Sequence, residues 1–421
     1  MMRLRKFLVV LLAAAAPSNG EAQNPFAQMG EARKAIIARD SAKAFAILDS
    51  IRTAVPDHPN YLYLRAHANA MAGRRDQAKA DIQQLLDWDV RYARSALRDT
   101  NVVSLRSEFA HVDSLARLAD QPISNGTVWA TVPERDLIAE GTAWDPGSRS
   151  VLIGSLNKYK IIAIAPDGAV TDRVATGAGG LRSVVGIHVD SVRRVLWVAS
   201  NARFDTPGDS TASALFAFDP ATGAFKSRLA VPGSERHFLN DITTGHDGTV
   251  YVTDTQAGRV WFAAPGSTEL RELTAIGKLI SPNGITISTD GRVLFVADVD
   301  HIQALDIASG KSWRVTVPGT FNVSGIDGLA FHRNALIAHH PLSYWRLAKY
   351  SLDPSWQRIT ARCLIEANTP DLRTSTTGEI AGSDYIYIGN SQIDRMNAKT
   401  IDAATMEPIR IYRATSQALG C

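Results

Sequence analysis

Cysteine is nearly absent from the chain: its 421 residues contain two, Cys363 and the terminal Cys421. At most one intramolecular disulfide can form. An oxidising compartment would allow this bond to hold the C-terminus against the body of the protein. The sequence leaves a free thiol at Cys421 as the alternative.

Long apolar runs are missing after the first residues. Residues 1–22 are predicted to form a signal peptide, because basic residues precede the apolar run Phe7–Ala16 and a small-x-small cleavage site ends at Ala22. That run is too short to cross a bilayer as a helix, and no later stretch approaches the roughly 20 apolar residues that a crossing needs. No cysteine follows it for lipid attachment. The mature protein is therefore expected to be exported and soluble, periplasmic or secreted, with no transmembrane segment.

A strong charge of either sign is also missing, since the formal net charge is +3. No basic cluster is interleaved with aromatic residues, so nucleic acid is not expected as a partner. With 45% hydrophobic residues, the chain has enough apolar side chains for a packed core.

Residues 23–120 carry helical patterns and no alternation of β-branched residues. Apolar residues recur at helical spacing, as at Ala44 and Leu48, and Gly73 marks a turn between two helical runs. Ala44 and Ala78 stand 34 residues apart, a spacing that resembles tetratricopeptide helical hairpins. The region is predicted to be a small all-α helical-repeat domain. It either binds a protein partner, mediates self-association, or simply packs against the rest of the chain.

Residues 126–421 show a pattern of short strands. Six hairpins each start at a small or turn-like residue, at intervals of 43 to 55 residues: Gly141, Gly186, Asp241, Gly284, Gly328 and Gly378. This is about the period of propeller blades. Further apolar runs follow in each unit, so four short strands per unit predict a mainly β fold, a six-bladed β-propeller preceded by the helical domain.

The strand Thr127–Val132 lies before the first hairpin and needs a partner. Closed propellers often complete one blade with a strand from the opposite end of the chain, which removes exposed strand edges. Thr127–Val132 is therefore predicted to pair with the blade that contains Tyr385–Ile388 and Ile409–Arg413.

The residue before each of the six hairpin positions is predicted to face the central channel, because the innermost strands of a propeller all start at one end of it. In chain order these ring residues are Glu140, Val185, Asn240, Asn283, Asp327 and Thr377. Four of the six offer carboxylate or amide oxygens, the ligands of a hard divalent cation. Glu140, Asn240, Asn283 and Asp327 are therefore predicted to bind one metal ion. Ordinary turn chemistry is the alternative explanation of each motif.

The second strand of each hairpin returns to the same end of the channel. Its last residues are predicted to form a second tier around a substrate: Ser155, Asn201, Asp254, Asp298, His340 and Asn390. Asp254 and Asp298 are expected to cap backbone N–H groups of the next turn. Asn201 and Asn390 are candidate substrate-binding residues, and His340 is a candidate acid or base because it titrates near neutrality.

Four motifs in this order resemble the family of gluconolactonases and regucalcin and, more distantly, the paraoxonases. They are Glu140–Pro146, Leu239–Ile242, Pro282–Ile285 with the turn and strand that follow, and Ile326–Leu329. The resemblance covers about residues 126–413 and excludes the helical part. It implies that Glu140, Asn283 and Asp327 hold one divalent cation, calcium in preference to zinc, and that Asn240 completes the metal shell or holds the substrate.

The same resemblance implies a hydrolase that opens a lactone or cleaves a related ester. A channel-bound cation polarises a carbonyl oxygen and lowers the pKa of a bound water, and Asp327 is expected to serve as both ligand and general base. Phe238 stands where the regucalcin-like branch has an arginine that contacts sugars, so a more apolar substrate is expected at Phe238. The rival hypothesis is a non-catalytic propeller that holds a structural ion and binds a ligand or protein.

Overall fold

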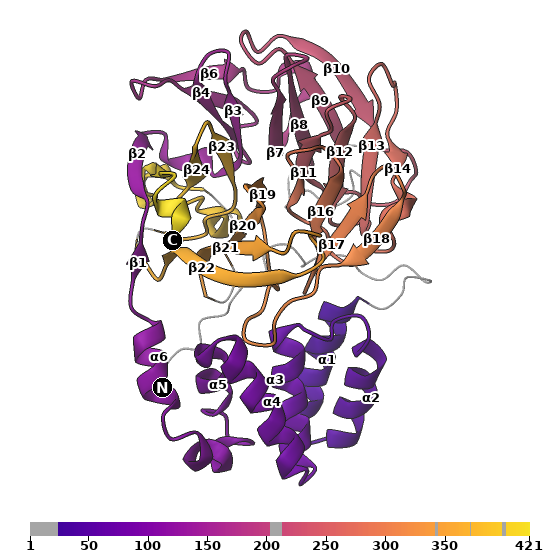
Figure 1. Ribbon diagram of the computed structural model, residues 1–421, viewed down its shortest axis with the longest axis vertical. Helices are drawn as coiled ribbons and strands as arrows, with labels where there is room; N and C mark the ends of the chain where they lie inside the picture. The colour runs from indigo at the N-terminus through magenta and orange to yellow at the C-terminus, as the bar shows by residue number, and fades with distance from the viewer. Residues whose placement is uncertain (1–23, 203–212, 342–343, 371, 398–400) are drawn as a thin grey trace.

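The computed structural model describes residues 24–202, 213–341, 344–370, 372–397 and 401–421, so the predicted signal peptide lies outside the described residues. Figure 1 shows two parts, a layer of helices and a β-propeller beside it. None of the described helices combines the length and the hydropathy that crossing a membrane would require.

The helical layer follows the predicted pattern. Its elements are α1 (Pro25–Ile37), α2 (Ser41–Ile51), α3 (Pro59–Met71), α4 (Arg75–Trp88), α5 (Val90–Ala96), the 3-10 helix η1 (Val103–Phe109) and α6 (Val112–Ala119). Gly73 turns the chain between α3 and α4 with a φ of +72°, a conformation that glycine adopts without strain. The apolar faces form two clusters, one shared by α1, α2 and α3 and one shared by the helices from α3 onward.

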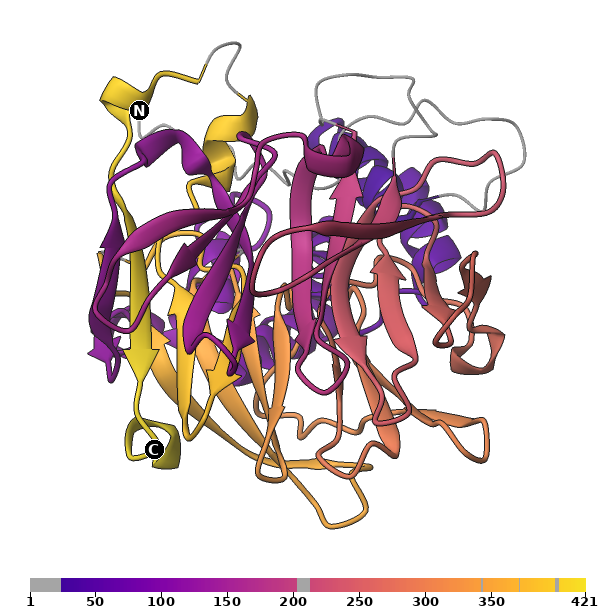
Figure 2. The same cartoon turned by 90° about the horizontal axis from the view of Figure 1, so that it is seen from above.

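The propeller has the six predicted blades, each an antiparallel sheet. Blades 1 to 3 consist of β3 (Ala139–Asp145), β4 (Ser150–Ser155), β5 (Ile161–Ile164) and β6 (Val170–Val174); β7 (Ser183–Asp190), β8 (Val195–Asn201), β9 (Ala214–Phe218) and β10 (Phe225–Ala230); and β11 (Leu239–Thr244), β12 (Val250–Asp254), β13 (Arg259–Ala263) and β14 (Arg271–Glu272). Blades 4 to 6 consist of β15 (Ile285–Ile287), β16 (Val293–Ala297), β17 (Ile302–Asp306) and β18 (Lys311–Arg314); β19 (Leu329–His332), β20 (Ala335–His340), β21 (Arg346–Leu352) and β22 (Ile359–Ala367); and β23 (Gly378–Ala381), β24 (Asp384–Ile388) and β25 (Ile409–Ala414). Figure 1 shows these blades arranged in a ring, and Figure 2 shows the propeller from the side.

The ring of blades is closed as predicted. Strand β2 (Thr127–Val132) pairs antiparallel with β25, with Thr127 opposite Arg413, and so supplies the fourth strand of blade 6. The short strand β1 (Ile123–Ser124) adds to β22 of blade 5. Strands from the start and the end of the propeller therefore hold it together, which leaves no open gap between its first and last blades.

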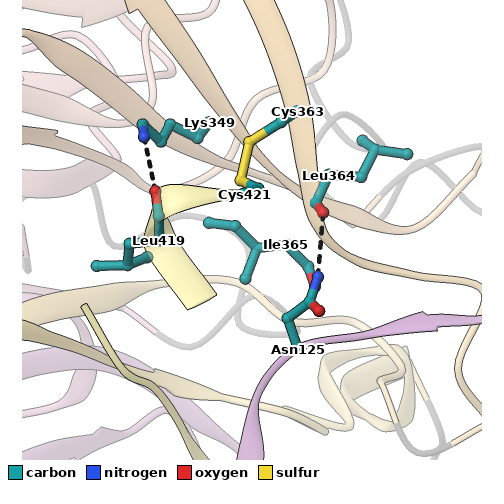
Figure 3. The surroundings of a disulfide bond; sticks show 7 residues. All are labelled: Asn125, Lys349, Cys363, Leu364, Ile365, Leu419 and Cys421. Atoms are coloured by element: carbon teal, nitrogen blue, oxygen red, sulfur yellow. Dashed lines mark hydrogen bonds between the residues drawn. A yellow bond between two sulfur atoms is a disulfide. The ribbon is translucent and has the colours of Figure 1, made fainter. Parts of the chain in front are cut away.

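Cys363 on β22 and the terminal Cys421 form a disulfide, with Cα atoms 6.2 Å apart. Figure 3 shows the bonds around it: Lys349 Nζ donates to the Leu419 carbonyl oxygen at 2.6 Å, and Asn125 Nδ2 donates to a backbone carbonyl of β22 at 3.1 Å. Of the two alternatives that the sequence left open, the structure therefore has the disulfide, and both the C-terminus and the segment before β2 are attached to blade 5.

The helical layer packs against blades 4 and 5. In the turn between α2 and α3, the Asp57 backbone N–H donates to Asp300 Oδ2 at 2.9 Å, and the Asp57 carbonyl accepts from Asn322 Nδ2 at 2.6 Å. The Asp57 carboxylate also pairs with Arg314 at 2.7 Å. Val299, from the loop after β16, packs into the apolar cluster of α1 to α3. On the propeller side these contacts lie in the loop between β16 and β17, on β18 and in the segment between β18 and β19.

Candidate metal centre

Neighbouring inner strands approach each other so closely at the ring that glycine follows most ring residues. A Cβ added at these glycines would overlap the carbonyl oxygen of the next blade's ring residue: Gly141 faces Val185, Gly186 faces Asn240, Gly284 faces Asp327 and Gly328 faces Thr376. In blades 1 to 3 the inner strand is also bulged at this point. The inner strands thus bring the predicted ring residues together around the channel.

In blade 6 the ring position belongs to Thr376, and the sequence-based assignment to Thr377 was one residue off. The Gly328 N–H donates to the Thr376 carbonyl at 2.8 Å, and this oxygen approaches Gly328 nearly as closely as the carbonyls of Val185, Asn240 and Asp327 approach their glycines. Thr377 instead donates its hydroxyl to the Glu140 carbonyl at 2.6 Å, which joins blade 6 to blade 1. Glycine is required at position 378 for a different reason, since an added Cβ would overlap two tyrosine residues of the same blade. The glycine that guided the alignment therefore has another role here.

The four predicted metal ligands lie on four different blades. Asn283 Nδ2 donates to Asp327 Oδ1 at 2.8 Å, and Asn240 Nδ2 donates to Thr255 Oγ1 at 3.1 Å. Among the described residues, Oδ1 of neither asparagine accepts a hydrogen bond. Oε2 of Glu140 is buried without any hydrogen-bond partner. Oxygen atoms of three of these side chains are thus left available to a ligand.

Burial raises the pKa of three carboxyl groups in the channel. Burial, followed by the charge of Asp327, raises the pKa of Glu140 well above its usual range. Burial raises the pKa of Asp327 to about 7 and that of Asp241 to about 8, and the charge of Asp327 adds to the second shift. Within the described part of the chain, no cationic side chain forms an ion pair with any of the three. Such a group of unneutralised acids favours either protons or a cation.

Asp241 was missed as a site residue by sequence reasoning. It occupies the position at which four of the other five blades have glycine, and that departure was the available signal. Together with Thr142, His188 and Glu379, it lines a cavity of about 520 Å³ in the channel. His188 faces this cavity with Nδ1 3.7 Å from Glu379 Oε2.

The six residues of the predicted second tier are all buried: Ser155, Asn201, Asp254, Asp298, His340 and Asn390. Asp254 accepts from the backbone N–H of Phe238 and, in the next turn as predicted, from that of Ala257. Asp298 accepts from the N–H groups of Ile280 and Ser281, which lie before β15 and not in the predicted turn after β16. Asn201 bonds both the N–H and the carbonyl of Leu239, at 2.8 and 2.7 Å. Asn390 accepts from the Arg410 N–H at 2.6 Å. This tier holds backbone segments in place.

His340 lies in a buried hydrogen-bonded network. Its Nδ1 is 3.1 Å from the Ser324 carbonyl, and its Nε2 is 2.9 Å from the Tyr350 hydroxyl. Burial, followed by the charge of Arg346, lowers the pKa of His340 well below its usual range. With both ring nitrogens engaged and the neutral form favoured, this is the environment of a structural histidine.

Phe238 is partly buried against an apolar cluster beside the ring. The cluster consists of Ile138, Leu156, Val185, Ile393, Met396 and Met406. Ile138 precedes Glu140 by two residues, and Val185 is the ring residue of blade 2. The surroundings of Glu140 are therefore apolar on this side.

The donor set fits a hard cation. No three His, Cys, Asp or Glu side chains in the described ranges are grouped as a metal site, so the candidate centre depends on amide as well as carboxylate oxygens. The 2.8 Å between Asn283 Nδ2 and Asp327 Oδ1 is a separation that two oxygens take when both bind one calcium ion at about 2.4 Å. Turning the Asn283 amide by half a rotation would present Oδ1 instead of Nδ2.

No protein-family model matches the chain, and no curated protein matches it in sequence. Three solved structures with a similar fold are a gluconolactonase from Xanthomonas campestris (17% identity, TM-score 0.49, covering 70% of this chain and 92% of that one); a calcium-binding regucalcin from Agrobacterium tumefaciens (16%, 0.47, 69% and 97%); and a PQQ-bound aldose sugar dehydrogenase from Streptomyces coelicolor (13%, 0.48, 70% and 99%). At these identities the similarity concerns the six-bladed propeller fold and gives no information on the substrate or metal of this chain.

Proposed function

We propose that this protein is a metal-dependent hydrolase that opens a lactone or cleaves a related ester in the propeller channel. The observation that carries the proposal is the meeting of the Glu140 and Asp327 carboxylates with the Asn240 and Asn283 amides, where one carboxylate oxygen is buried without a partner. Such oxygens are suited to a divalent cation, calcium in preference to zinc.

In this proposal Glu140, Asn240, Asn283 and Asp327 hold the cation. When bound, it polarises the substrate carbonyl and makes a water molecule more acidic. Asp327 keeps a second oxygen for a proton, because the cation would take Oδ1, the atom to which Asn283 donates here, and no described residue donates to Oδ2. Oδ2 takes the proton of the attacking water. The Thr255 hydroxyl orients the Asn240 amide through their 3.1 Å hydrogen bond.

The proposed substrate is apolar beside its reacting carbonyl. Phe238 and the cluster around Val185 supply an apolar wall next to the ring, where they would hold an acyl chain or ring and limit access of water. Aryl esters and lactones with alkyl side chains are therefore the first compounds to test.

The proposal is tested by metal analysis and hydrolysis assays on one set of proteins: wild type, Asp327→Ala, Asn283→Ala and, as a control on an exposed turn, Asp167→Ala. We expect about one divalent ion per chain and turnover for wild type and the control, with both lost together in the two ring variants. Metal-free, inactive wild-type protein would refute the proposal.

A second candidate function is a non-catalytic propeller with a structural ion. It is favoured by the burial of the site, since Glu140, Asn240 and Asp327 are each at most 5% exposed. Catalytic metals keep an open coordination position for water or substrate. Stoichiometric metal without turnover of any ester or lactone would favour this candidate. The next search would then be for a protein partner of the helical layer, or for self-association through it.

We also propose that the protein acts outside the cytoplasm, in the periplasm or as a secreted protein. The disulfide between Cys363 and Cys421 supports this, because such bonds persist in oxidising compartments. Mass spectrometry of the protein from a secreting host should give a chain that starts at Gln23; a chain that retains residues 1–22 would contradict export by cleavage.

A further inference from the structure

Two hydroxyl groups from blade 6 lie beside Glu140 without a hydrogen-bond partner. Thr376 is 1% exposed and Ser391 is fully buried. Oγ1 of Thr376, Oγ of Ser391 and Oε2 of Glu140 are all buried and unpaired. Burial raises the pKa of Glu140 and the two hydroxyls oppose that shift, so both lie close enough to interact with the carboxyl group, although neither meets hydrogen-bond geometry.

Buried polar groups in folded proteins are normally paired, and leaving one unpaired is costly. Three such groups at one point call for a common explanation. A bound cation supplies it: the cation would take one oxygen of the ionised Glu140, and the hydroxyls would rotate to donate to the other.

Blade 6 is the neighbouring blade that can donate hydrogen bonds to the Glu140 carboxylate. On its other side the ring residue is Val185, whose apolar side chain offers no hydrogen bond. Thr376 occupies the ring position of blade 6, and Ser391 follows β24 of the same blade. Thr377 bonds the backbone carbonyl of Glu140 and leaves its carboxylate free.

We propose that Thr376 and Ser391 are positioning residues of the metal centre, whose hydroxyls donate to the Glu140 carboxylate and fix it for a bound cation. This inference rests on the metal site of the proposed function and adds two residues that the sequence did not indicate. It does not depend on which ester or lactone is hydrolysed.

The test is calorimetric titration of EDTA-stripped protein with calcium chloride. Thr376→Val keeps the shape of the side chain and removes the hydroxyl, Ser391→Ala removes the second hydroxyl, and Thr376→Ser restores the first. Thr249→Val, in a buried turn after β11, measures the general effect of losing a buried hydroxyl. We expect calcium affinity to fall about 10-fold or more in Thr376→Val and Ser391→Ala, since partners of metal ligands have effects of this size. Thr376→Ser and Thr249→Val should bind like wild type.

Thermal unfolding of the same proteins in EDTA separates positioning from structure. Because the hydroxyls are unpaired without metal, their removal should not lower the melting temperature of the metal-free protein. A lower melting temperature with unchanged calcium affinity would assign them a structural role and overturn the inference. If Thr376→Val fails to fold, Ser391→Ala carries the test alone.

The remaining outcomes distinguish the inference from the proposed function. Wild-type affinity in both hydroxyl variants overturns the positioning role and leaves the metal site standing. Loss of affinity in Thr376→Ser as large as in Thr376→Val shows that the hydroxyl is not what matters. Wild-type protein that binds no calcium refutes the metal site and this inference together.

Discussion

Replacing Asp327 by asparagine should stabilise the metal-free protein at neutral pH and destabilise the calcium-loaded one. Burial raises the pKa of Asp327 from 3.8 to about 7. In the unfolded chain this carboxyl ionises near its ordinary pKa, so between these two values the folded state binds more protons than the unfolded state does. The stability of the metal-free protein is therefore lost as the pH rises through this window, and Asp327→Asn removes that loss.

The magnitude follows from the shift. One pKa unit corresponds to about 1.4 kcal/mol, so ionising Asp327 inside the metal-free fold costs about 4 kcal/mol above pH 7. At pH 5 the cost is about 2 kcal/mol, because this pH lies only a little above 3.8, the ordinary pKa at which the carboxyl ionises in the unfolded chain. The free energy of unfolding of Asp327→Asn relative to wild type should thus grow by about 3 kcal/mol between pH 5 and pH 8. The amide Oδ1 of the variant can still accept from Asn283.

The assay is urea unfolding at pH 5, 6, 7 and 8 in EDTA, with each variant compared to wild type at the same pH. This comparison is needed because buried histidines titrate in the opposite sense: burial lowers the pKa of His58 to about 4 and that of His339 to about 3. Asp167→Asn, at an exposed turn, is the control. With saturating calcium the sign should reverse, since the variant loses a ligand. A stability difference in EDTA that is independent of pH would refute the reasoning about Asp327.

Three further predictions concern the framework of the site. Gly284→Ala should destabilise the fold by about 1–3 kcal/mol and weaken calcium binding, because its Cβ would overlap the Asp327 carbonyl; chemical unfolding and calorimetry measure both. Replacing Cys363 and Cys421 by alanine should lower the stability by up to about 4 kcal/mol, as expected for opening a loop with a sequence separation of 58 residues, in denaturant titrations without reductant. Asp300→Ala should release the helical layer, because its carboxylate holds the turn between α2 and α3, and limited proteolysis should then cut between the two parts.

Matched controls accompany these three. Gly30→Ala, where an added Cβ meets nothing within 4 Å, should be neutral or slightly stabilising because alanine favours a helix. If it costs as much as Gly284→Ala, close packing is not the cause. Wild type treated with reductant should match the double cysteine variant. If Asp300→Ala resists proteolysis like wild type, the clamp on the α2–α3 turn is not what holds the helical layer to the propeller.

The ring of blades and its closure could be predicted from the sequence because both depend on local residue patterns that repeat at regular intervals along the chain. Alternating apolar strands, glycine at most points of close approach and an unpartnered first strand are enough to infer six blades closed by β2. The oxygen-bearing residues before those glycines follow from the same alignment. The misplacement in blade 6 arose where the local cue has another cause, since Gly378 makes room for tyrosines of its own blade.

The roles of Asn201, Asn390 and His340 could not be predicted, because they depend on which polar groups come within reach after folding. Asn201 and Asn390 carry the same amide as Asn240, yet in the tertiary structure their amide groups form hydrogen bonds with the backbone of neighbouring segments. His340 likewise differs from a catalytic histidine only through its burial and its two hydrogen-bond partners.

By itself, the sequence determined the order of the two parts, the number of blades and the ring residues of five of the six blades, because these depend on periodicity and on residue size. Only the tertiary structure decided the electrostatics of the channel. Asp241, Glu140 and Asp327 lie far apart in the chain. Desolvation raises the pKa of all three, and the charge of Asp327 adds to the shifts of Glu140 and Asp241; both effects exist only once the blades have closed around these groups. The formation of the disulfide and the packing of the helical layer on blades 4 and 5 were likewise decided by distances that no local pattern contains.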